Sequence, residues 1–330
     1  MRIGIVGAGA IGSLLGARLA VSGSDVTFID LPPRLAALRK DGVRIVATDG
    51  STVRLASPQL AECGQEVIAL DAVILAVKAH DVAACLPALK VLLGEQTAVI
   101  TIQNGIPWWY FERHAGPLAG TRLSSLDPDG SIAAAIDARR IIGCVAYPAA
   151  ALASDGTVEH VEGQRFPLGE IDGATTPRVQ AFAAAFTAAG FKSPVLEDIR
   201  AETWLKAWGN LSFNPVSALT GATMGEICQQ PETRGLVVAM MREAQVIAEA
   251  LGINFRVSLE RRLAGAAQLG KHRTSMLQDL ESGRRLELDA LVGAVLEIGS
   301  LVGRDAPSIR LVYALTKLLD VNRRAAARAD

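Results

Sequence analysis

The sequence lacks an excess of charge of either sign. Its 33 Lys and Arg residues almost balance its 34 Asp and Glu residues, which leaves a net charge of -1. Proteins that bind nucleic acid usually present a basic surface to the phosphates, so we expect no nucleic-acid partner. Half of the 330 residues are apolar and only 20% are charged. This balance excludes a disordered chain and allows one large or two medium-sized cores.

Cysteine is scarce, and we expect neither a leader peptide nor a membrane span near the beginning of the chain. The four cysteines, at positions 63, 85, 144 and 228, are far apart and form no metal-binding pairs. We therefore predict reduced, mostly buried thiols, no metal centre and a cytoplasmic location. The first predicted strand begins at Arg2, which leaves no room for a signal peptide, and the uncharged run of residues 3–17 is short for a membrane span.

A glycine-rich turn joins the first predicted strand, Arg2–Val6, to a predicted helix over Ser13–Ala20. The turn reads Gly7-Ala8-Gly9-Ala10-Ile11-Gly12. Its glycines permit a tight turn, close approach of the backbone to a pyrophosphate, and close packing of helix on strand. The helix N-terminus adds free amide donors and a positive dipole end. We expect all six residues of the turn to bind a dinucleotide.

An acidic residue follows the second predicted strand, Asp25–Ile29, about twenty residues after the turn, at the spacing expected for dinucleotide binding. The carboxylate of Asp30 would accept hydrogen bonds from the adenosine ribose and repel a 2′-phosphate, which favours NAD over NADP. Two alternatives stay open. Arg34 could still reach a phosphate, and Asp30 could instead cap the helix that starts near Pro33. The cofactor is thus NAD or NADP.

Two further buried strands, Ala72–Val77 and Ala98–Ile102, are each followed by polar residues. Ligands of open parallel sheets bind beyond the carboxyl ends of the strands, so Lys78 and Asn104 are candidates to contact cofactor or substrate. Lys78 could equally be a solvated lysine. Asn104 offers a donor and an acceptor to a carboxylate, hydroxyl or ribose, but with Gly105 it could serve only as a turn former.

The order of predicted elements indicates two domains. Val43–Leu55 is predicted to form a hairpin around Asp49-Gly50. Strands near residues 140–147, 156–161 and 165–169 could extend the sheet with antiparallel edge strands. Only helical patterns follow. We predict an α/β Rossmann-type domain over residues 1–195, with a mostly parallel doubly wound sheet, and an all-α substrate and catalytic domain over residues 196–330.

The second domain opens with a predicted short helix over Thr203–Pro215 that is apolar except on one face. Lys206, Asn210 and Asn214 recur every four residues, so they fall within about 80° of one another and span about 12 Å. Burying an ammonium and two carboxamides costs free energy unless polar groups hydrogen-bond to them. The pattern therefore indicates a bound ligand or a water-filled cleft. The alternative is a purely structural polar network.

These motifs occur together in an order that resembles the ketopantoate reductases (2-dehydropantoate 2-reductases). The resemblance rests on the glycine turn, Val77-Lys78, Gln103-Asn104-Gly105, the Lys206, Asn210, Asn214-Pro215 repeat, Ser275 to Asp279, and Glu287 with Asp289. It implies reduction of 2-dehydropantoate to pantoate by a nicotinamide cofactor, a step towards pantothenate and coenzyme A. Many members carry an arginine just beyond the second strand for the NADP phosphate, whereas Asp30-Leu31 stands here.

The resemblance also implies roles for the polar residues. Lys206 would be the general acid, and Glu287 would orient the substrate hydroxyl and the lysine. The implied binding residues are Asn210 and Asn214 for substrate, Asn104 and Ser275 for polar groups of substrate or cofactor, and Lys78 near the cofactor.

Two other functions remain open at the level of the sequence. The chain could reduce another branched 2-keto acid, or it could be a catalytically silent dinucleotide sensor, which would have no reason to keep Lys206 and Glu287. The expected partner is a small 2-keto acid. A homodimer through the helical domain is plausible, although apolar stripes there are explained more simply as core.

Overall fold

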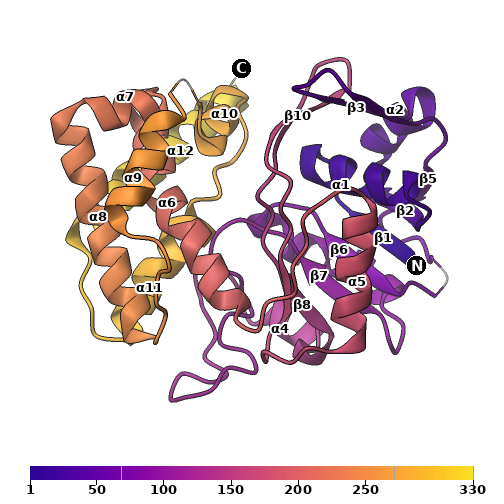
Figure 1. The fold of residues 1–330 in the computed structure, drawn as a ribbon, viewed down its shortest axis with the longest axis horizontal. Helices are drawn as coiled ribbons and strands as arrows, with labels where there is room; N and C mark the ends of the chain where they lie inside the picture. Colours follow the sequence, from indigo (N-terminus) through magenta and orange to yellow (C-terminus); the bar gives the residue numbers. More distant parts are fainter. Residues whose placement is uncertain (68, 271, 330) are drawn as a thin grey trace. The chain divides into compact units, whose positions relative to one another are not determined.

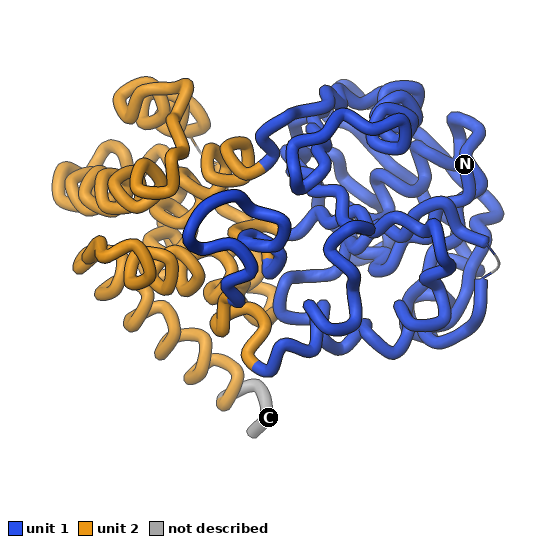
Figure 2. The backbone as a smooth tube through the Cα atoms, turned by 90° about the horizontal axis from the view of Figure 1, so that it is seen from below, with its two compact units in different colours: residues 1–103, 108–122, 129–199 blue, residues 104–107, 123–128, 200–330 orange. Residues whose placement is uncertain are grey.

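The computed structural model describes residues 1–67, 69–270 and 272–329, and it divides into two compact units (Figure 2). Unit 1 contains Met1–Gln103, Trp108–Arg122 and Asp129–Ile199. Unit 2 contains Asn104–Pro107, Leu123–Pro128 and Arg200–Asp330. The last change of unit falls four residues after the boundary drawn from the sequence, and two short segments of the first half belong to unit 2. No helix in the described part of the chain is long and apolar enough to cross a membrane.

Unit 1 is built on a seven-stranded sheet in the order β11-β8-β7-β6-β1-β2-β5. Its strands are β1 Arg2–Val6, β2 Asp25–Asp30, β5 Gln59–Glu62, β6 Ala72–Leu75, β7 Ala98–Thr101, β8 Ile141–Cys144 and β11 Leu168–Glu170. Neighbouring strands are parallel except β11, which pairs with β8 in antiparallel register. The predicted fold class, a mostly parallel sheet with an antiparallel edge strand, is confirmed.

A second, four-stranded sheet has the order β4-β3-β10-β9. It consists of β3 Val43–Ala47, β4 Thr52–Leu55, β9 Ala149–Leu152 and β10 Val158–Glu162. The predicted hairpin is confirmed as β3 and β4. Two of the expected antiparallel edge strands are wrong. β8 lies inside the main sheet and runs parallel to β7. β10 belongs to the second sheet. The reason lies in α1 (Ala10–Val21), which is apolar nearly all round and contacts strands of both sheets (Figure 1). An apolar helix of this kind must be buried on both sides, and the second sheet packs against the side that the main sheet does not cover.

The remaining helices of unit 1 are short and sit at the strand connections. They are α2 Pro32–Asp41, α3 Leu86–Leu92, α4 Ser131–Ala135, α5 Pro177–Ala188 and the 3-10 turns η1 Ala79–Asp81, η2 Ala83–Cys85 and η3 Ala138–Arg140. Trp108, Trp109 and Tyr110 are buried and pack inside the protein. All four cysteines are free thiols, but only Cys144 is buried, because the other three lie in loops or at helix ends.

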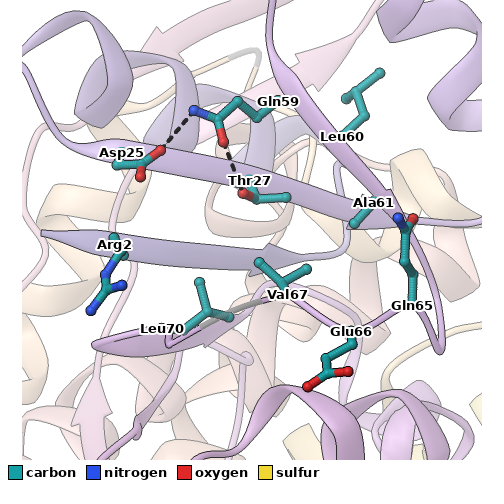
Figure 3. A pocket seen from close by; sticks show the side chains of 10 residues that line it. All are labelled: Arg2, Asp25, Thr27, Gln59, Leu60, Ala61, Gln65, Glu66, Val67 and Leu70. Carbon is teal, nitrogen blue, oxygen red and sulfur yellow. Dashed lines mark hydrogen bonds between the residues drawn. The ribbon is translucent and has the colours of Figure 1, made fainter.

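A shallow pocket in unit 1 lies at the amino ends of β1 and β2 (Figure 3). Arg2 and Asp25 are the first residues of these strands, and Gln59 donates to Asp25 at 2.7 Å. The glycine turn follows the other end of β1. This pocket is therefore at the opposite end of the strands from the place where parallel sheets bind their ligands.

Unit 2 is helical apart from its loops (Figure 1). It contains α6 Ile199–Thr220, whose first residue belongs to unit 1, followed by α7 Met224–Gln229, α8 Pro231–Ala250, α9 Leu259–Gln268, α10 Ser275–Glu281, the π-helix η4 Asp289–Gly293, α11 Ala294–Leu301 and α12 Pro307–Ala329. The predicted short helix is in fact the 22-residue α6, which continues through Pro215. Proline removes one backbone hydrogen bond, and the burial of Leu211, Phe213 and Val216 outweighs that loss.

The segment Leu123–Pro128 is fastened within unit 2 by one carboxylate. Glu297 of α11 accepts hydrogen bonds from the backbone amide and hydroxyl of Ser124, both at 2.7 Å, and from the amide of Ser125 at 2.8 Å. Burial alone would raise the pKa of Glu297, but these hydrogen bonds outweigh it and leave the pKa below 4.5. The carboxylate therefore stabilises the fold above this pH, and the contribution is lost as the pH falls through the lowered value.

Replacing Glu297 with Gln tests this fastening. We expect Glu297→Gln to lower the free energy of unfolding by about 1 kcal/mol at pH 7, near the low end for charged hydrogen bonds because the carboxylate is half-exposed. The difference from the unmodified protein should shrink below pH 4.5, as measured by urea unfolding across a pH series. A difference that does not change with pH would contradict the role given to the charge.

Candidate active site

The buried face of α6 fixes the direction in which its polar face points. Trp204 and Trp208 are fully buried. The indole of Trp208 donates to the carbonyl oxygen of Met241 at 2.7 Å and stacks on Phe255, with ring centroids 4.2 Å apart. Because these large side chains fit in only one orientation, α6 cannot rotate about its axis without losing a buried hydrogen bond and its packing. The face bearing the lysine is thus set by the core of unit 2.

Three predicted site residues meet within unit 2. The Nζ atom of Lys206 donates to Oδ1 of Asn104 at 2.5 Å, and Nδ2 of Asn104 lies 3.5 Å from Oε2 of Glu287. All three side chains are half-buried. The amide of Asn104 thus uses its acceptor for the cation and turns its donor to the carboxylate. Asn104 also precedes a turn at Gly105, where φ is +86°, as the turn-forming alternative expects.

A second pair lies further along the same face of α6. Asn214 is only 4% exposed, and its Nδ2 lies 3.5 Å from the hydroxyl of Ser275, the first residue of α10. Asn210, half-buried, stands between this pair and Lys206 on the helix. An ammonium and two carboxamides along one face of α6, with the hydroxyl of Ser275 next to the last of them, suit a ligand with several oxygens.

The glycine turn of unit 1 has the geometry that a dinucleotide requires. Gly7 has φ +97°, and a Cβ there would lie 2.8 Å from the side chain of Val77. A Cβ on Gly12 would lie 2.0 Å from the carbonyl oxygen of Gly7, whereas a Cβ on Gly9 would meet nothing within 4 Å. Gly9 is also the N-cap of α1 and has no side-chain cap. An open surface of backbone amides at a helix N-terminus fits a pyrophosphate.

Asp30 touches the same turn. Its carboxylate accepts from the backbone amide of Ala8 at 2.6 Å and from that of Leu31 at 2.7 Å. The alternative in which Asp30 caps the next helix is wrong, since the N-cap of α2 is Leu31 and has no side-chain cap. The Arg34 guanidinium donates through Nε to the carbonyl oxygen of Ala8 at 2.7 Å and through Nη2 to Ser13 at 3.2 Å. Burial lowers the pKa of Arg34, and the charge of Asp30 partly offsets this.

Lys78 follows β6 in unit 1 and is the N-cap of η1. We predicted no role for Gln103 from the sequence, yet its side chain links the ends of two strands. Its amide group donates to the carbonyl oxygens of Leu75 at 2.7 Å and Val77 at 3.2 Å. The only signal in the sequence for this role was a glutamine directly after a buried predicted strand.

Among the described residues, no group of three or more His, Cys, Asp or Glu side chains could hold a metal ion.

Comparison with known proteins gives the family. Residues 3–173 match the family described as ketopantoate reductase PanE/ApbA, and residues 198–320 match its C-terminal counterpart. The chain belongs to the ketopantoate reductase family. The members of this family are oxidoreductases that use a nicotinamide dinucleotide, and the glycine turn described above fits such a cofactor.

Ketopantoate reductases from several sources resemble the chain over nearly its full length. A 2-dehydropantoate 2-reductase from Mesorhizobium japonicum is 47% identical over 324 residues, which are 98% of this chain and 99% of that protein. The structure of a candidate ketopantoate reductase from Ralstonia solanacearum MolK2 is 40% identical, covers 98% of each chain and superposes with a TM-score of 0.90. D-mandelate dehydrogenase, solved with NADH and anilino(oxo)acetate, shares the fold at 21% identity, with a TM-score of 0.82 over 98% of this chain and 99% of that one.

The substitution Gly9→Ala separates cofactor binding from folding. Alanine is compatible with φ -69° and ψ -166° and meets no neighbour, so the free energy of unfolding should not fall. A methyl group at the point where the backbone approaches a pyrophosphate should weaken dinucleotide binding at least about tenfold. Isothermal titration with NADH and NADPH measures this. Unchanged affinity for both would mean that the turn does not hold the pyrophosphate.

Proposed function

We propose that the chain reduces 2-dehydropantoate to pantoate, with Lys206 as the proton donor. The observation that carries this proposal is the Lys206–Asn104–Glu287 cluster, in which a half-buried ammonium is linked to a carboxylate through one carboxamide. A ketone that receives a hydride develops negative charge on its oxygen. A fixed cation with a proton to give stabilises this charge most strongly where water is scarce.

These groups account for the protons that the reaction transfers. A reduced nicotinamide, when bound, would supply the hydride for the ketone carbon. Lys206 gives one proton from Nζ to the ketone oxygen, so the carbonyl becomes a secondary alcohol and the lysine becomes a neutral amine. The amine then takes up a proton from water. Glu287, joined to the lysine through Asn104, favours the protonated lysine at the start of each turnover.

The remaining polar side chains suit the other oxygens of the substrate. A 2-keto acid with a hydroxyl presents a carboxylate and an alcohol besides the ketone. Asn210, Asn214 and Ser275 supply amide and hydroxyl donors from α6 and the start of α10. We assign the substrate carboxylate and hydroxyl to these residues, and Lys78 of unit 1 to the cofactor side.

We propose NADH as the preferred reductant. The carboxylate of Asp30 sits at the glycine turn, where it would accept from ribose hydroxyls and repel a 2′-phosphate. The nearby cation, Arg34, already donates to Ala8 and Ser13. Leu31, where many family members have an arginine, offers no charge to a phosphate.

The substitution Lys206→Ala tests the proton donor. We expect kcat with 2-dehydropantoate to fall by about 10² to 10⁴, because general-acid catalysis contributes a factor of this size. The dissociation constant of the dinucleotide should stay within about twofold of its original value. Lys90→Ala, at an exposed position of α3, is the control and should leave both quantities unchanged. Full turnover of the Lys206→Ala variant would refute the proposal, and lost stability with normal turnover would indicate a structural network.

A panel of 2-keto acids assayed with the unmodified protein tests the substrate. 2-Dehydropantoate should give the highest kcat/KM, because its hydroxyl adds a hydrogen bond that simple branched 2-keto acids lack. A higher kcat/KM for a keto acid without that hydroxyl would mean that this keto acid, and not 2-dehydropantoate, is the preferred substrate.

The substitution Asp30→Asn tests the cofactor preference. Removing the negative charge should raise the ratio of kcat/KM for NADPH to that for NADH at least about tenfold, mainly through a lower KM for NADPH. Asp25→Asn, at the other end of β2, removes the same charge and should leave the ratio unchanged. Equal ratios in the two variants would contradict the role of Asp30.

A further inference from the structure

The segment Asn104–Pro107 is held in unit 2 by the peptide group between Ala290 and Leu291. Ile106 donates its backbone amide to the carbonyl oxygen of Ala290 at 2.9 Å. Gly105 lies against the same peptide, and a Cβ on it would fall 2.3 Å from the Ala290 oxygen. Its φ of +86° is also one that side chains rarely adopt. Only glycine satisfies both conditions, so the contact depends on this residue.

The carbonyl group of Ala290 can accept this bond because the helix there is wound in the π form. In η4 the backbone amide of Ala294 donates to Asp289, five residues earlier. In an α-helix the same amide would donate to Ala290, four residues earlier. The wider turn thus leaves the Ala290 oxygen open to Ile106. Single π-turns of this kind occur frequently at functional sites.

The π-turn is itself tied to α12. The hydroxyl of Tyr313 donates to Oδ1 of Asp289 at 2.7 Å, and Nζ of Lys317 donates to the oxygen of Tyr313 at 2.9 Å. Burial raises the pKa of Tyr313, and the charge of Asp289 adds to this, while the hydrogen bond from Lys317 works against it. The hydroxyl therefore keeps its proton and remains a donor at neutral pH. The bond holds the first residue of the π-turn.

We propose that the π-turn Asp289–Gly293 is the positioning element of the site and that Gly105 and Tyr313 are positioning residues. The π-turn acts on both partners of the lysine. It holds Asn104 through Gly105 and Ile106, and it holds the backbone of Glu287, because the amide of Leu291 in the π-turn donates to the carbonyl oxygen of Glu287 at 3.2 Å. The inference rests on the proposed function, in which Lys206 gives the proton. An Asn104 side chain that is already held in place needs no reorganisation during the reaction, whereas a mobile side chain would.

The substitution Gly105→Ala tests the contact with Ala290. The added methyl group cannot share space with the Ala290 oxygen, so the segment lifts and Asn104 leaves the lysine. We expect kcat to fall roughly a hundredfold with a much smaller change in KM, because small misplacements of a site residue cost about this factor. The alkaline limb of the kcat–pH profile should also move to lower pH, since the ammonium loses an acceptor.

The control for backbone strain is Gly252→Ala. Gly252 lies in the same unit with φ +81°, and a Cβ there meets nothing within 4 Å. This variant carries the same conformational cost without the collision, so its kcat and pH profile should stay unchanged. If Gly105→Ala and Gly252→Ala behaved alike in kcat and pH profile, Gly105 would have only a structural role and the inference would be wrong.

A double-mutant cycle identifies Asn104 as the group that is positioned. The double variant Asn104→Ala/Gly105→Ala should lose no more kcat than Asn104→Ala alone, because the methyl group can no longer misplace a missing carboxamide. Losses that add up would overturn the inference.

If Gly105→Ala does not fold, Tyr313→Phe provides the second test. It removes one hydroxyl from the π-turn and keeps the ring, and it should lower kcat about three- to tenfold with the same direction of pH shift. An unchanged kcat and pH profile would contradict the inference.

The proposed function and the positioning inference fail in different ways. Normal turnover of Lys206→Ala would refute the proton donor whatever Gly105→Ala does. A large loss in Lys206→Ala together with no effect in Gly105→Ala would leave the function intact and refute only the positioning role of the π-turn.

Discussion

The carboxamide of Asn104 holds a lysine ammonium at one end and faces a glutamate carboxylate with the other. A carboxamide is the side chain suited to this position, because it carries a donor and an acceptor on one rigid plane. The cluster costs free energy to bury, and the polar partners offset that cost. Unit 2 brings these three groups together from α6, from the residues just before η4 and from the segment Asn104–Pro107.

Chain topology makes this cluster possible. Asn104 comes from a segment that follows a strand of the sheet in unit 1, yet it packs as part of unit 2. Glu297 fastens a second such segment, Leu123–Pro128, by accepting hydrogen bonds from Ser124 and Ser125. The chain therefore changes unit five times rather than once (Figure 2). Two local contacts, one to the carbonyl group of Ala290 in the π-turn and one to the half-exposed carboxylate of Glu297, secure the two segments.

The sequence predicted what local pattern and spacing determine. The glycine turn, the parallel sheet, the Asp49-Gly50 hairpin and the polar face of α6 follow from periodicity and turn chemistry, and the structure contains each of them. It did not predict that β10 joins a second sheet, that α6 passes through Pro215, or that Gly105 docks on Ala290. These features depend on contacts between residues far apart in the chain. Such contacts leave no periodic pattern in the sequence. The hydrogen bonds of Arg34 and Gln103 could not be predicted from the sequence for the same reason.

The most direct test of the account is a crystal structure of the protein with a bound nicotinamide dinucleotide and a non-reducible amide analogue of the 2-keto acid. The account predicts Nζ of Lys206 within about 2.6–3.2 Å of the oxygen that replaces the ketone oxygen, with Asn104 still in contact with the lysine. If the lysine lies outside hydrogen-bonding distance of that oxygen while another side chain donates to it, the central claim is wrong.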